Sequence, residues 1–458
     1  MEPSYVDFIN HRVKLNPCVS HLSKHMQGVG RAKSRIVSLK CGNSTVSKPT
    51  VLNEEEVSTW INIKFSGTRI LLVENISKNL ICILGKALDI DPVFFTDHIA
   101  TDFGDFETSP APPSMANLPS HMCEREYLHL HYQQILDLGD ANHFTKAKYA
   151  LKTLSNTPRN VRRLAPLSGR QLALARACCS LLVKGIGNPV CLVLIDPPVN
   201  EVGIEVAGVW QSYPARLLNG GPESFGQPES FSSFREAKSE RESTMLATLL
   251  HHFQTPVDSP SILQLGYGPI RVVLAEWNMY MSLISRYEKH YEYSLRDISV
   301  RSHDEDIVEL QRWKRRSRQS LHKLTLLYHF VTHLKRGDDW DLILMDIDFM
   351  RQRLQSYGQG LEQTVAMATT MVQLQDSQRS ILEAVNVKKL TLIAIIFIPL
   401  SWVSSLFSMS DGYAPGQANF WVYFAVAVPF AVLVVILSII PLPNIDKVLT
   451  RKHVKTMP

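Results

Sequence analysis

The sequence predicts a membrane protein with a large α/β domain, long stalk helices and two C-terminal transmembrane helices. Three observations predict this fold class. Strand-like and helix-like segments alternate in residues 57–300, and a helical repeat begins at about Asp304. Two apolar segments, Leu390–Phe407 and Phe420–Ile440, then contain no charged residue. Each is close to the ~20 residues that a helix needs to cross a bilayer.

The first segment, residues 1–56, is basic. No acidic residue occurs between Phe8 and Asn53, although eight lysines and arginines do. Organellar transit peptides and disordered tails share this composition, and Glu2 and Asp7 count against a transit peptide. We therefore predict a basic, disordered N-terminal tail, with import as the alternative.

Composition excludes several functions. The net charge of +5 is too small and too dispersed to indicate a nucleic-acid partner. The seven cysteines form no C-x-x-C pair, which predicts free thiols in a reducing compartment. Walker A, G-x-S-x-G and H-E-x-x-H motifs are absent from the sequence, so we expect no enzymatic activity.

Residues 57–303 are predicted to form the α/β domain. Arg69–Glu74 and Val190–Ile195 are apolar, β-rich runs that predict buried strands. Ser77 is placed to cap a helix through Leu88, and Asp91 followed by proline is typical of a helix start.

Residues 304–389 are predicted to form a helical stalk. After a stop near Gly337, apolar residues recur at multiples of seven with companions three places later, as in a coiled-coil seam. The repeat comprises Ile347, Leu354, Leu361, Ala368 and Leu382, with Met350, Tyr357, Met371 and Val385. Because no strong stop precedes Leu390, we expect one helix of roughly 65 to 70 residues that continues into the first span. We predict that this seam joins copies of the chain.

Charge predicts the topology of the two spans. Lysines flank the first span at 388 and 389, and basic residues fill the tail at 441–458, whereas the connection at 408–419 contains none. Basic residues favour the cytosolic side. We therefore expect transmembrane helices at 390–407 and 420–440, an external loop between them and both termini in the cytosol.

One face of the first span carries small or hydroxyl-bearing side chains. They recur at helical spacing and are Thr391, Ala394, Ile398, Ser401, Ser405 and Ser408. Hydroxyls can bond to the waters of a hydrated cation, so this stripe is a candidate pore lining. Close packing of helices through small residues is the alternative.

Acidic residues at the start of the long helix are a second candidate site. Asp346 and Asp348 can be interpreted as a regulatory Mg²⁺ site, because Mg²⁺ needs only one or two carboxylates plus waters. The simpler interpretation is that acidic residues favour a helix N-terminus.

Several segments resemble the CorA family of divalent-cation channels. Lys388–Ser401 and Leu406–Ser410 are similar to its hallmark membrane segment. Arg69–Asn75, Leu88–Phe95, Ile195–Pro198 and Gln311–Arg316 resemble the cytosolic domain of its fungal branch. The resemblance implies a homopentamer with a cytosolic funnel, a pore-lining first span and passage of hydrated Mg²⁺ or a related divalent cation.

The selectivity mouth departs from the family pattern. The family ends its first span with Gly-Met-Asn, where this chain has Ser408-Met409-Ser410 followed by Asp411. At the cytosolic mouth, the resemblance assigns the family's polar positions to Gln373 and Ala384, beside Leu390. A serine side chain is shorter than asparagine, so discrimination among ions is expected to be weaker.

The sequence therefore predicts a channel for divalent metal cations, with a non-conducting scaffold or regulator of a conducting relative as the alternative. Expected partners are other copies of the chain, the lipid bilayer and divalent cations, without a tightly bound cofactor. The plasma membrane is the expected location, and the inner mitochondrial membrane is the alternative.

Overall fold

The computed structural model describes residues 3–439 apart from 29–31, 43–44, 64, 66, 101–117, 145–149, 186–188, 207–208, 219–243, 255–260, 297–302, 336–337 and 410–415. The chain divides into two compact units, residues 1–364 and 365–458. The basic tail predicted at 441–458 lies outside the described residues.

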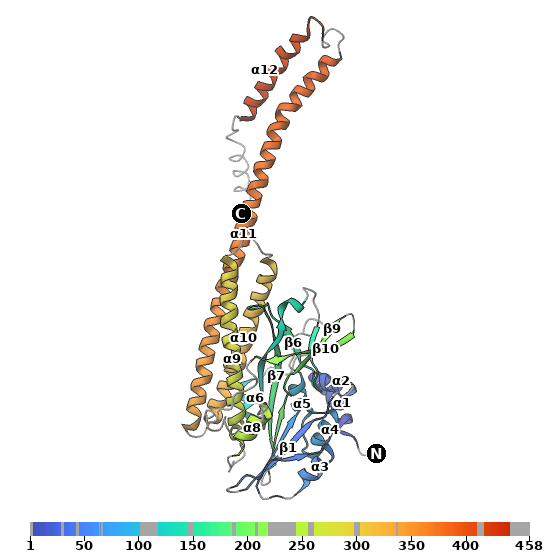
Figure 1. Ribbon diagram of the computed structural model, residues 1–458, viewed down its shortest axis with the longest axis vertical. Coiled ribbons are helices and arrows are strands. Elements are labelled where there is room, and N and C mark those ends of the chain that lie inside the picture. The colour runs from blue at the N-terminus through green and yellow to red at the C-terminus, as the bar shows by residue number, and fades with distance from the viewer. Residues whose placement is uncertain are drawn as a thin grey trace, which may run out of the picture. The chain divides into compact units, whose positions relative to one another are not determined.

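A mixed sheet of eleven strands forms the centre of the first unit (Figure 1). The strands are β1 (Arg35–Cys41), β2 (Thr50–Leu52), β3 (Thr68–Glu74), β4 (Tyr127–Asp140), β5 (Ala150–Thr153), β6 (Asn160–Arg163), β7 (Arg170–Lys184), β8 (Val190–Ile195), β9 (Glu201–Val206), β10 (Val209–Pro214) and β11 (Arg216–Leu217). The predicted strands at 69–74 and 190–195 are confirmed as β3 and β8, which pair in parallel. All other pairs of named strands are antiparallel.

Strand β7 organises the sheet because it pairs with three neighbours. Its 15 residues pair with β4 along one edge, and with β6 and then β8 along the other. Between its partners β6 and β8, the Cys178 amide of β7 donates to the Asp196 carboxylate instead of to a strand.

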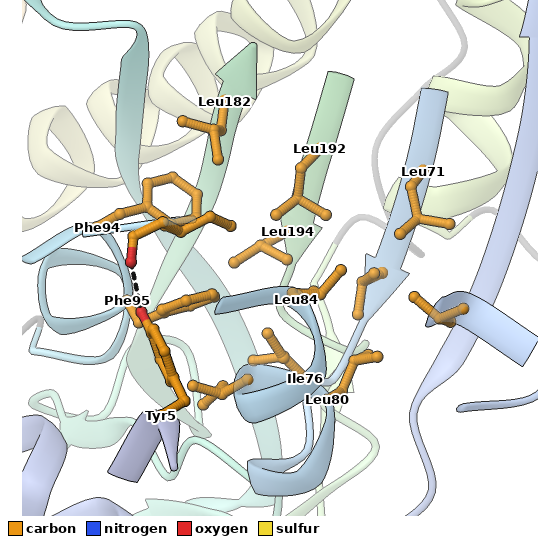
Figure 2. Close-up of a cluster of buried hydrophobic side chains, with 14 of the residues drawn as sticks. Tyr5, Leu71, Ile76, Leu80, Leu84, Phe94, Phe95, Leu182, Leu192 and Leu194 are labelled. Carbon is orange, nitrogen blue, oxygen red and sulfur yellow. Dashed lines mark hydrogen bonds between the residues drawn. The ribbon is translucent and has the colours of Figure 1, made fainter. Parts of the chain in front are cut away.

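Short helices cover one face of the sheet. They are α1 (Tyr5–Leu15), α2 (Ser20–Gln27), α3 (Glu54–Asn62), α4 (Lys78–Ala87) and α5 (Pro92–Ile99). As predicted, Ser77 caps α4 by accepting a hydrogen bond from the Leu80 amide, and Asp91 caps α5 through Val93. Figure 2 shows Leu182, Leu192 and Leu194 of the sheet meeting Leu84 and Phe94 of these helices in one apolar cluster.

The N-terminal residues are folded, which differs from the disordered tail predicted for 1–56. Helix α1 begins with a capping box at Ser4, its Tyr5 hydroxyl donates to the Ile90 carbonyl at 2.6 Å, and Ile9 is fully buried. Strand β1 pairs with β3 over its whole length. Composition misled the prediction because the apolar residues of α1 and α2 are sparse, yet they gather on the sides that face the core.

The opposite face of the sheet carries α9 (Ile262–Arg296). Leu182 belongs to the cluster with α4 and α5, whereas its neighbour Leu181 lies against Gly266 of α9. Successive strand residues point to opposite faces, so α9 and the short helices sandwich the sheet. Other helices of the chain are α6 (Pro119–Glu124), α8 (Met245–His252), α10 (His303–Leu334), α11 (Asp341–Ser408) and α12 (Phe420–Ile439), with 3₁₀ turns η1 (Pro17–Val19), η3 (Ala141–His143) and η4 (Asp338–Trp340).

Helix α11 has 68 residues, which confirms the prediction of one continuous helix. The first half of the predicted seam, however, is buried inside the chain: Ile347, Leu354 and Leu361 are at most 1% exposed. The Ser317 hydroxyl of α10 donates to the Leu354 carbonyl at 3.1 Å, and Arg351 stacks on Tyr328. The prediction that this half joins copies of the chain is wrong, because α10 already covers it.

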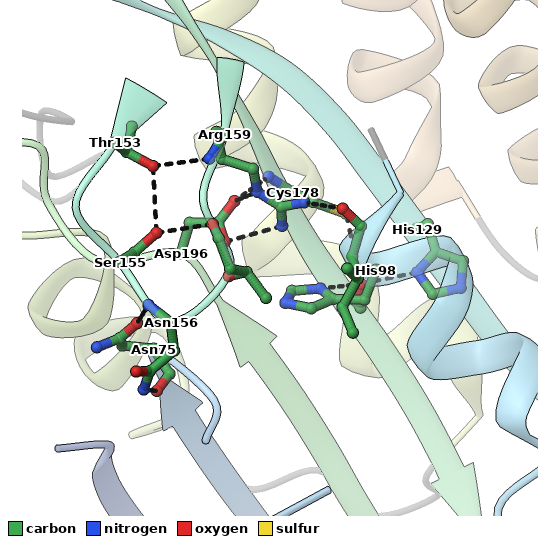
Figure 3. A network of polar contacts seen from close by, with 12 residues as sticks. Asn75, His98, His129, Thr153, Ser155, Asn156, Arg159, Cys178 and Asp196 are labelled. Carbon is green, nitrogen blue, oxygen red and sulfur yellow. Dashed lines mark hydrogen bonds and ion pairs between the residues drawn. The ribbon is translucent and has the colours of Figure 1, made fainter. Parts of the chain in front are cut away.

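Polar residues buried in the sheet form a connected network (Figure 3). Arg159 donates through Nε and Nη2 to the two carboxylate oxygens of Asp196, at 2.9 Å each. The Cys178 amide donates to the same carboxylate at 2.8 Å. The Ser180 hydroxyl lies 2.8 Å from Nδ1 of His98 and 2.7 Å from Nδ1 of His129. None of the seven cysteines, all of which are described, forms a disulfide.

Candidate functional site: the apolar helix hairpin

The second unit contains the candidate site, formed by α11 from residue 365 onward and by α12. Among the described residues, α11 alone is long and apolar enough to cross a membrane, and only 11% of its most apolar 18-residue window is buried. The apolar stretch described in α12, Phe420–Ile436, is shorter. The second predicted span corresponds to α12, a helix of 20 residues in which the described apolar stretch ends at Ile436.

Aromatic and small side chains hold α11 and α12 together. The rings of Trp402 and Phe430 lie 5.9 Å apart, as do those of Phe407 and Tyr423. Between these pairs, Val403 and Ala427 are 2% and 1% exposed. The side of α11 that carries Val403 and Phe407 therefore faces α12.

The predicted stripe lies on the other side of α11. At about 100° per residue, its six positions fall within an arc whose centre is roughly opposite Val403 and Phe407. Ala394 is half-buried and the other five residues are exposed, with Ile398 67% exposed. The stripe is thus available to solvent or to another chain.

Polar groups on this face keep part of their hydrogen-bonding capacity. The Thr391 hydroxyl donates to the Val387 carbonyl at 2.8 Å, so its lone pairs remain to accept from water. The remaining polar members of the stripe are serines, each with a hydroxyl that both donates and accepts. Such a row can contact the water shell of a cation without a fixed charge.

The residues predicted at the cytosolic mouth continue the same face. Gln373, Ala384 and Leu390 are all exposed. Helical geometry places Gln373 and Ala384 within about 20° of Thr391, and Leu390 falls at the opposite border of the arc. The arc of about 120° from Gln373 to Ser408 therefore carries these side chains, although from residue 376 to residue 393 the other sides of α11 are exposed as well.

The predicted selectivity mouth is only partly described. Ser408 is the last residue of α11, and Met409 follows with 85% of its surface exposed. Ser410 and Asp411 lie outside the described residues. The serine substitution in the motif is visible only in the sequence.

The acidic residues proposed as a regulatory metal site belong to the first unit. The Asp348 carboxylate pairs with Arg351 at 3.2 Å and accepts from the Gln352 amide at 2.7 Å, while Asp346 is exposed. Across the described residues, no cluster of three or more His, Cys, Asp or Glu side chains is placed to hold a metal ion. A bound Mg²⁺ at Asp348 would compete with Arg351.

Comparison with known proteins identifies one domain. Residues 277–443 match the family model described as "CorA-like Mg2+ transporter protein", so the match includes most of α9 and all of α10, α11 and α12. No curated protein matches the chain. Residues 277–443 are thus similar to the domain that this family model describes.

Two solved structures are similar over most of their length. One is "The complete structure of CorA magnesium transporter from Methanocaldococcus jannaschii", with 12% identity, coverage of 88% of this chain and 96% of that chain, and a TM-score of 0.40. The other is "structure of the full-length CmaX protein", with 13% identity, coverage of 89% and 98%, and a TM-score of 0.38.

Sequence reasoning missed several features of the matched region and the sheet. It assigned 262–296 to the α/β domain, where the structure has the 35-residue helix α9. It also gave no role to Arg159, which is fully engaged with Asp196. The run of apolar and aromatic residues in 262–291 was the signal that could have predicted α9. No local sequence pattern indicates that Arg159 pairs with Asp196, 37 residues later.

Proposed function

We propose that the chain is the subunit of an oligomeric channel that passes divalent metal cations, with hydrated Mg²⁺ as the preferred ion. The observation that carries the proposal is the stripe from Thr391 to Ser408, which lies on the side of α11 opposite Val403 and Phe407 and is exposed apart from the half-buried Ala394. The match of residues 277–443 to the CorA-like Mg²⁺ transporter family model supports it.

A single hairpin encloses no pore, so conduction needs several copies around an axis. In our proposal five copies place their α11 faces around the axis, and α12 of each copy faces lipid as a second span. Both termini lie in the cytosol, and the plasma membrane is the proposed location. Two of the segments that resemble the fungal branch lie in the first unit. Arg69–Asn75 covers most of β3 and the next residue, and Leu88–Phe95 covers the turn after α4 and the first half of α5.

Hydrated passage follows from the side chains available. Mg²⁺ sheds its water shell reluctantly, and the face offers hydroxyls and one amide instead of carboxylates. Those groups can contact the shell but cannot replace it. Ile398 would form an apolar constriction in the row.

A cysteine test distinguishes this face from the rest of the hairpin. Ser405→Cys should make Mg²⁺ uptake into liposomes sensitive to a membrane-impermeant cationic thiol reagent, because the new thiol lines the ion path. The matched control is Val428→Cys on α12, which is exposed on the other helix and should be insensitive. Equal block of both variants, or of neither, would contradict the pore assignment.

A non-conducting scaffold or regulator is the second candidate function, and Ser410 in place of asparagine is the observation that favours it. Absence of flux from the unaltered chain and from the Ser408→Gly, Ser410→Asn double variant would select this function. Native mass spectrometry of the detergent-solubilised chain tests assembly in both cases, and a monomer or dimer would contradict a pentamer.

A further inference from the structure

A small cavity lies in the first unit between the sheet and α9. Its polar lining comes from Tyr132 and Gln134 of β4, Asp196 after β8, and Glu276 of α9. The remaining lining residues are Pro198, Leu217, Met245 and Thr244, whose hydroxyl oxygen accepts from the Ala247 amide at 3.2 Å. The cavity volume is about 10 Å³, near the lower limit that holds one water molecule.

Two neutral oxygen atoms at this cavity lack hydrogen-bond partners among the described residues. They are the Tyr132 hydroxyl and Oε1 of Gln134. Both side chains are more than nine-tenths buried, at 3% and 6% exposure. A buried polar atom without a partner costs about 1 to 3 kcal/mol, so a bound species is expected to satisfy them.

The charges at the cavity do not balance. Asp196 is compensated by Arg159, which holds both of its carboxylate oxygens. Glu276 is half-buried, and among the described residues no charged side chain shifts its pKa. Burial raises the pKa of Glu276 to about 7. When ionised, the carboxylate leaves one uncompensated negative charge beside the Gln134 carbonyl oxygen, which can only accept, and the Tyr132 hydroxyl, whose lone pairs can also coordinate a cation.

We propose that this cavity binds one dehydrated monovalent metal cation, Na⁺ or K⁺, through Glu276, Gln134 and Tyr132. All three offer oxygen, the donor that hard cations prefer, and protein oxygens can replace the hydration shell of such an ion. A single positive charge balances Glu276. Mg²⁺ does not fit, because it keeps several waters and the cavity has room for about one.

This site is separate from the proposed ion path. It lies wholly within residues 1–364, whereas the exposed face of α11 belongs to the second unit. Its occupancy is measured by binding, so the result does not depend on whether the chain conducts.

The test is the thermal stability of the full chain in detergent at pH 8, where Glu276 is ionised. Choline chloride, whose cation is too large for the cavity, is replaced stepwise by NaCl or KCl at constant ionic strength. A cation that binds the folded protein raises Tm by about 2 °C or more when its concentration reaches ~100 times Kd. The Glu276→Gln variant should lose this shift.

Glu288→Gln is the matched control. Glu288 lies on the same helix, is half-buried and does not line the cavity, so the control should keep the shift. The proposal is overturned if wild type shows no shift, if Glu276→Gln shifts as much as wild type, or if Mg²⁺ at equal ionic strength stabilises the protein as well as Na⁺ and K⁺ do.

A second measurement uses competition with protons. The ionisable groups that line the cavity with Glu276 are Tyr132 and the Arg159-bound Asp196, and burial keeps the Tyr132 hydroxyl protonated by raising its pKa. At pH 6 Glu276 is mostly protonated, so the apparent affinity for the cation falls and the cation-dependent shift should become smaller. A shift of unchanged size at pH 6 would place the cation elsewhere and overturn the proposal.

Discussion

The sheet unit and the helix hairpin differ in where their side chains find partners. In the sheet unit, even the guanidinium of Arg159 is 2% exposed and is satisfied by Asp196 and the Ile99 carbonyl. In the hairpin, Leu392, Phe397 and Ile398 are each more than half exposed. Within the hairpin, the contacts between α11 and α12 involve only one side of α11.

This difference indicates how each region is stabilised. The sheet unit buries its apolar surface and pairs most of its buried charges within one chain, so its stability depends on internal contacts. The hairpin exposes a contiguous apolar surface of the kind that marks a membrane or protein contact. Variants in the two regions should therefore fail in different assays.

The largest effect is expected from breaking the buried ion pair. Arg159→Met should lower the free energy of unfolding of the sheet unit by about 3 to 5 kcal/mol, because it leaves the Asp196 carboxylate buried without its cation. Denaturant unfolding of the full chain in detergent, followed by tryptophan fluorescence, measures this. The double variant Arg159→Met, Asp196→Leu should recover part of the loss; an unchanged midpoint for the single variant would contradict the role of the pair.

Two leucines of the same heptad repeat sharpen the comparison. Leu354→Ala should cost about 2 to 5 kcal/mol, because Leu354 is fully buried and truncation leaves a cavity. Leu382→Ala should leave unfolding of the sheet unit unchanged, since Leu382 is 65% exposed, and should weaken assembly instead. Thermal denaturation and native mass spectrometry separate the two outcomes, and similar destabilisation by both variants would contradict this division.

Acid should destabilise the sheet unit. Burial holds the pKa values of His98, His129 and His131 well below the usual 6.5. Below pH 6.5 the unfolded chain takes up protons that the folded protein excludes, so stability falls by about 1.4 kcal/mol per pH unit for each net proton. Burial raises the pKa of Asp97 to about 6 and that of Glu276 to about 7. These two carboxyls retain protons that the unfolded chain releases, which offsets part of the loss.

We expect the net effect to be a Tm that falls steadily from pH 6.5 to pH 5. His129→Asn should make the fall less steep by removing one excluded proton, although it also removes a hydrogen bond to Ser180. Differential scanning fluorimetry of the full chain tests this prediction. A Tm that is constant or rises over this range would show that the histidines are not held neutral.

The smallest expected effect concerns the mouth of the hairpin. Ser408→Gly with Ser410→Asn should increase the preference for Mg²⁺ over competing ions a few-fold, because a carboxamide reaches further into the water shell than a hydroxyl. Asp411→Asn should lower total flux at low salt, because a carboxylate raises the local cation concentration. Liposome flux with a Mg²⁺ indicator measures both. An unchanged ion preference in the double variant would contradict the assignment of Ser410 to the selectivity mouth.

Local signals in the sequence predicted much of the sheet and the helix starts. The β-rich run at 190–195 and the caps at Ser77 and Asp91 each act within a few residues, and each appears in the structure. The folded N-terminus was missed because its stability comes from distant contacts, such as Tyr5 with Ile90. Amino-acid composition does not indicate which distant residues come into contact.

The sequence predicted which residues of the candidate site share one side of α11, but it did not predict which chain each side of that helix contacts. Spacing alone placed Thr391 and Ser405 on one stripe, and packing against α12 later separated that stripe from the buried side. The heptad repeat failed at Leu354 because a period of seven specifies a helical partner without specifying whether it belongs to the same chain. Glu276 had no sequence signal, since a lone glutamate in a helix is ordinarily solvated.

Strand β7 also constrains how the protein folds. Strand β7 lacks one of its partners until β8 has been synthesised. Strand β3 also pairs with β8, and its Arg69 pairs with Val190, some 120 residues later in the chain. Pairings between such distant segments make folding slow, in the range of milliseconds to seconds. Synthesis of the intervening residues takes longer still, at about 5 to 20 residues per second. The edge of β3 that pairs with β8 therefore stays unpaired for seconds, and chaperone binding during synthesis is expected to concentrate on this part of the nascent chain.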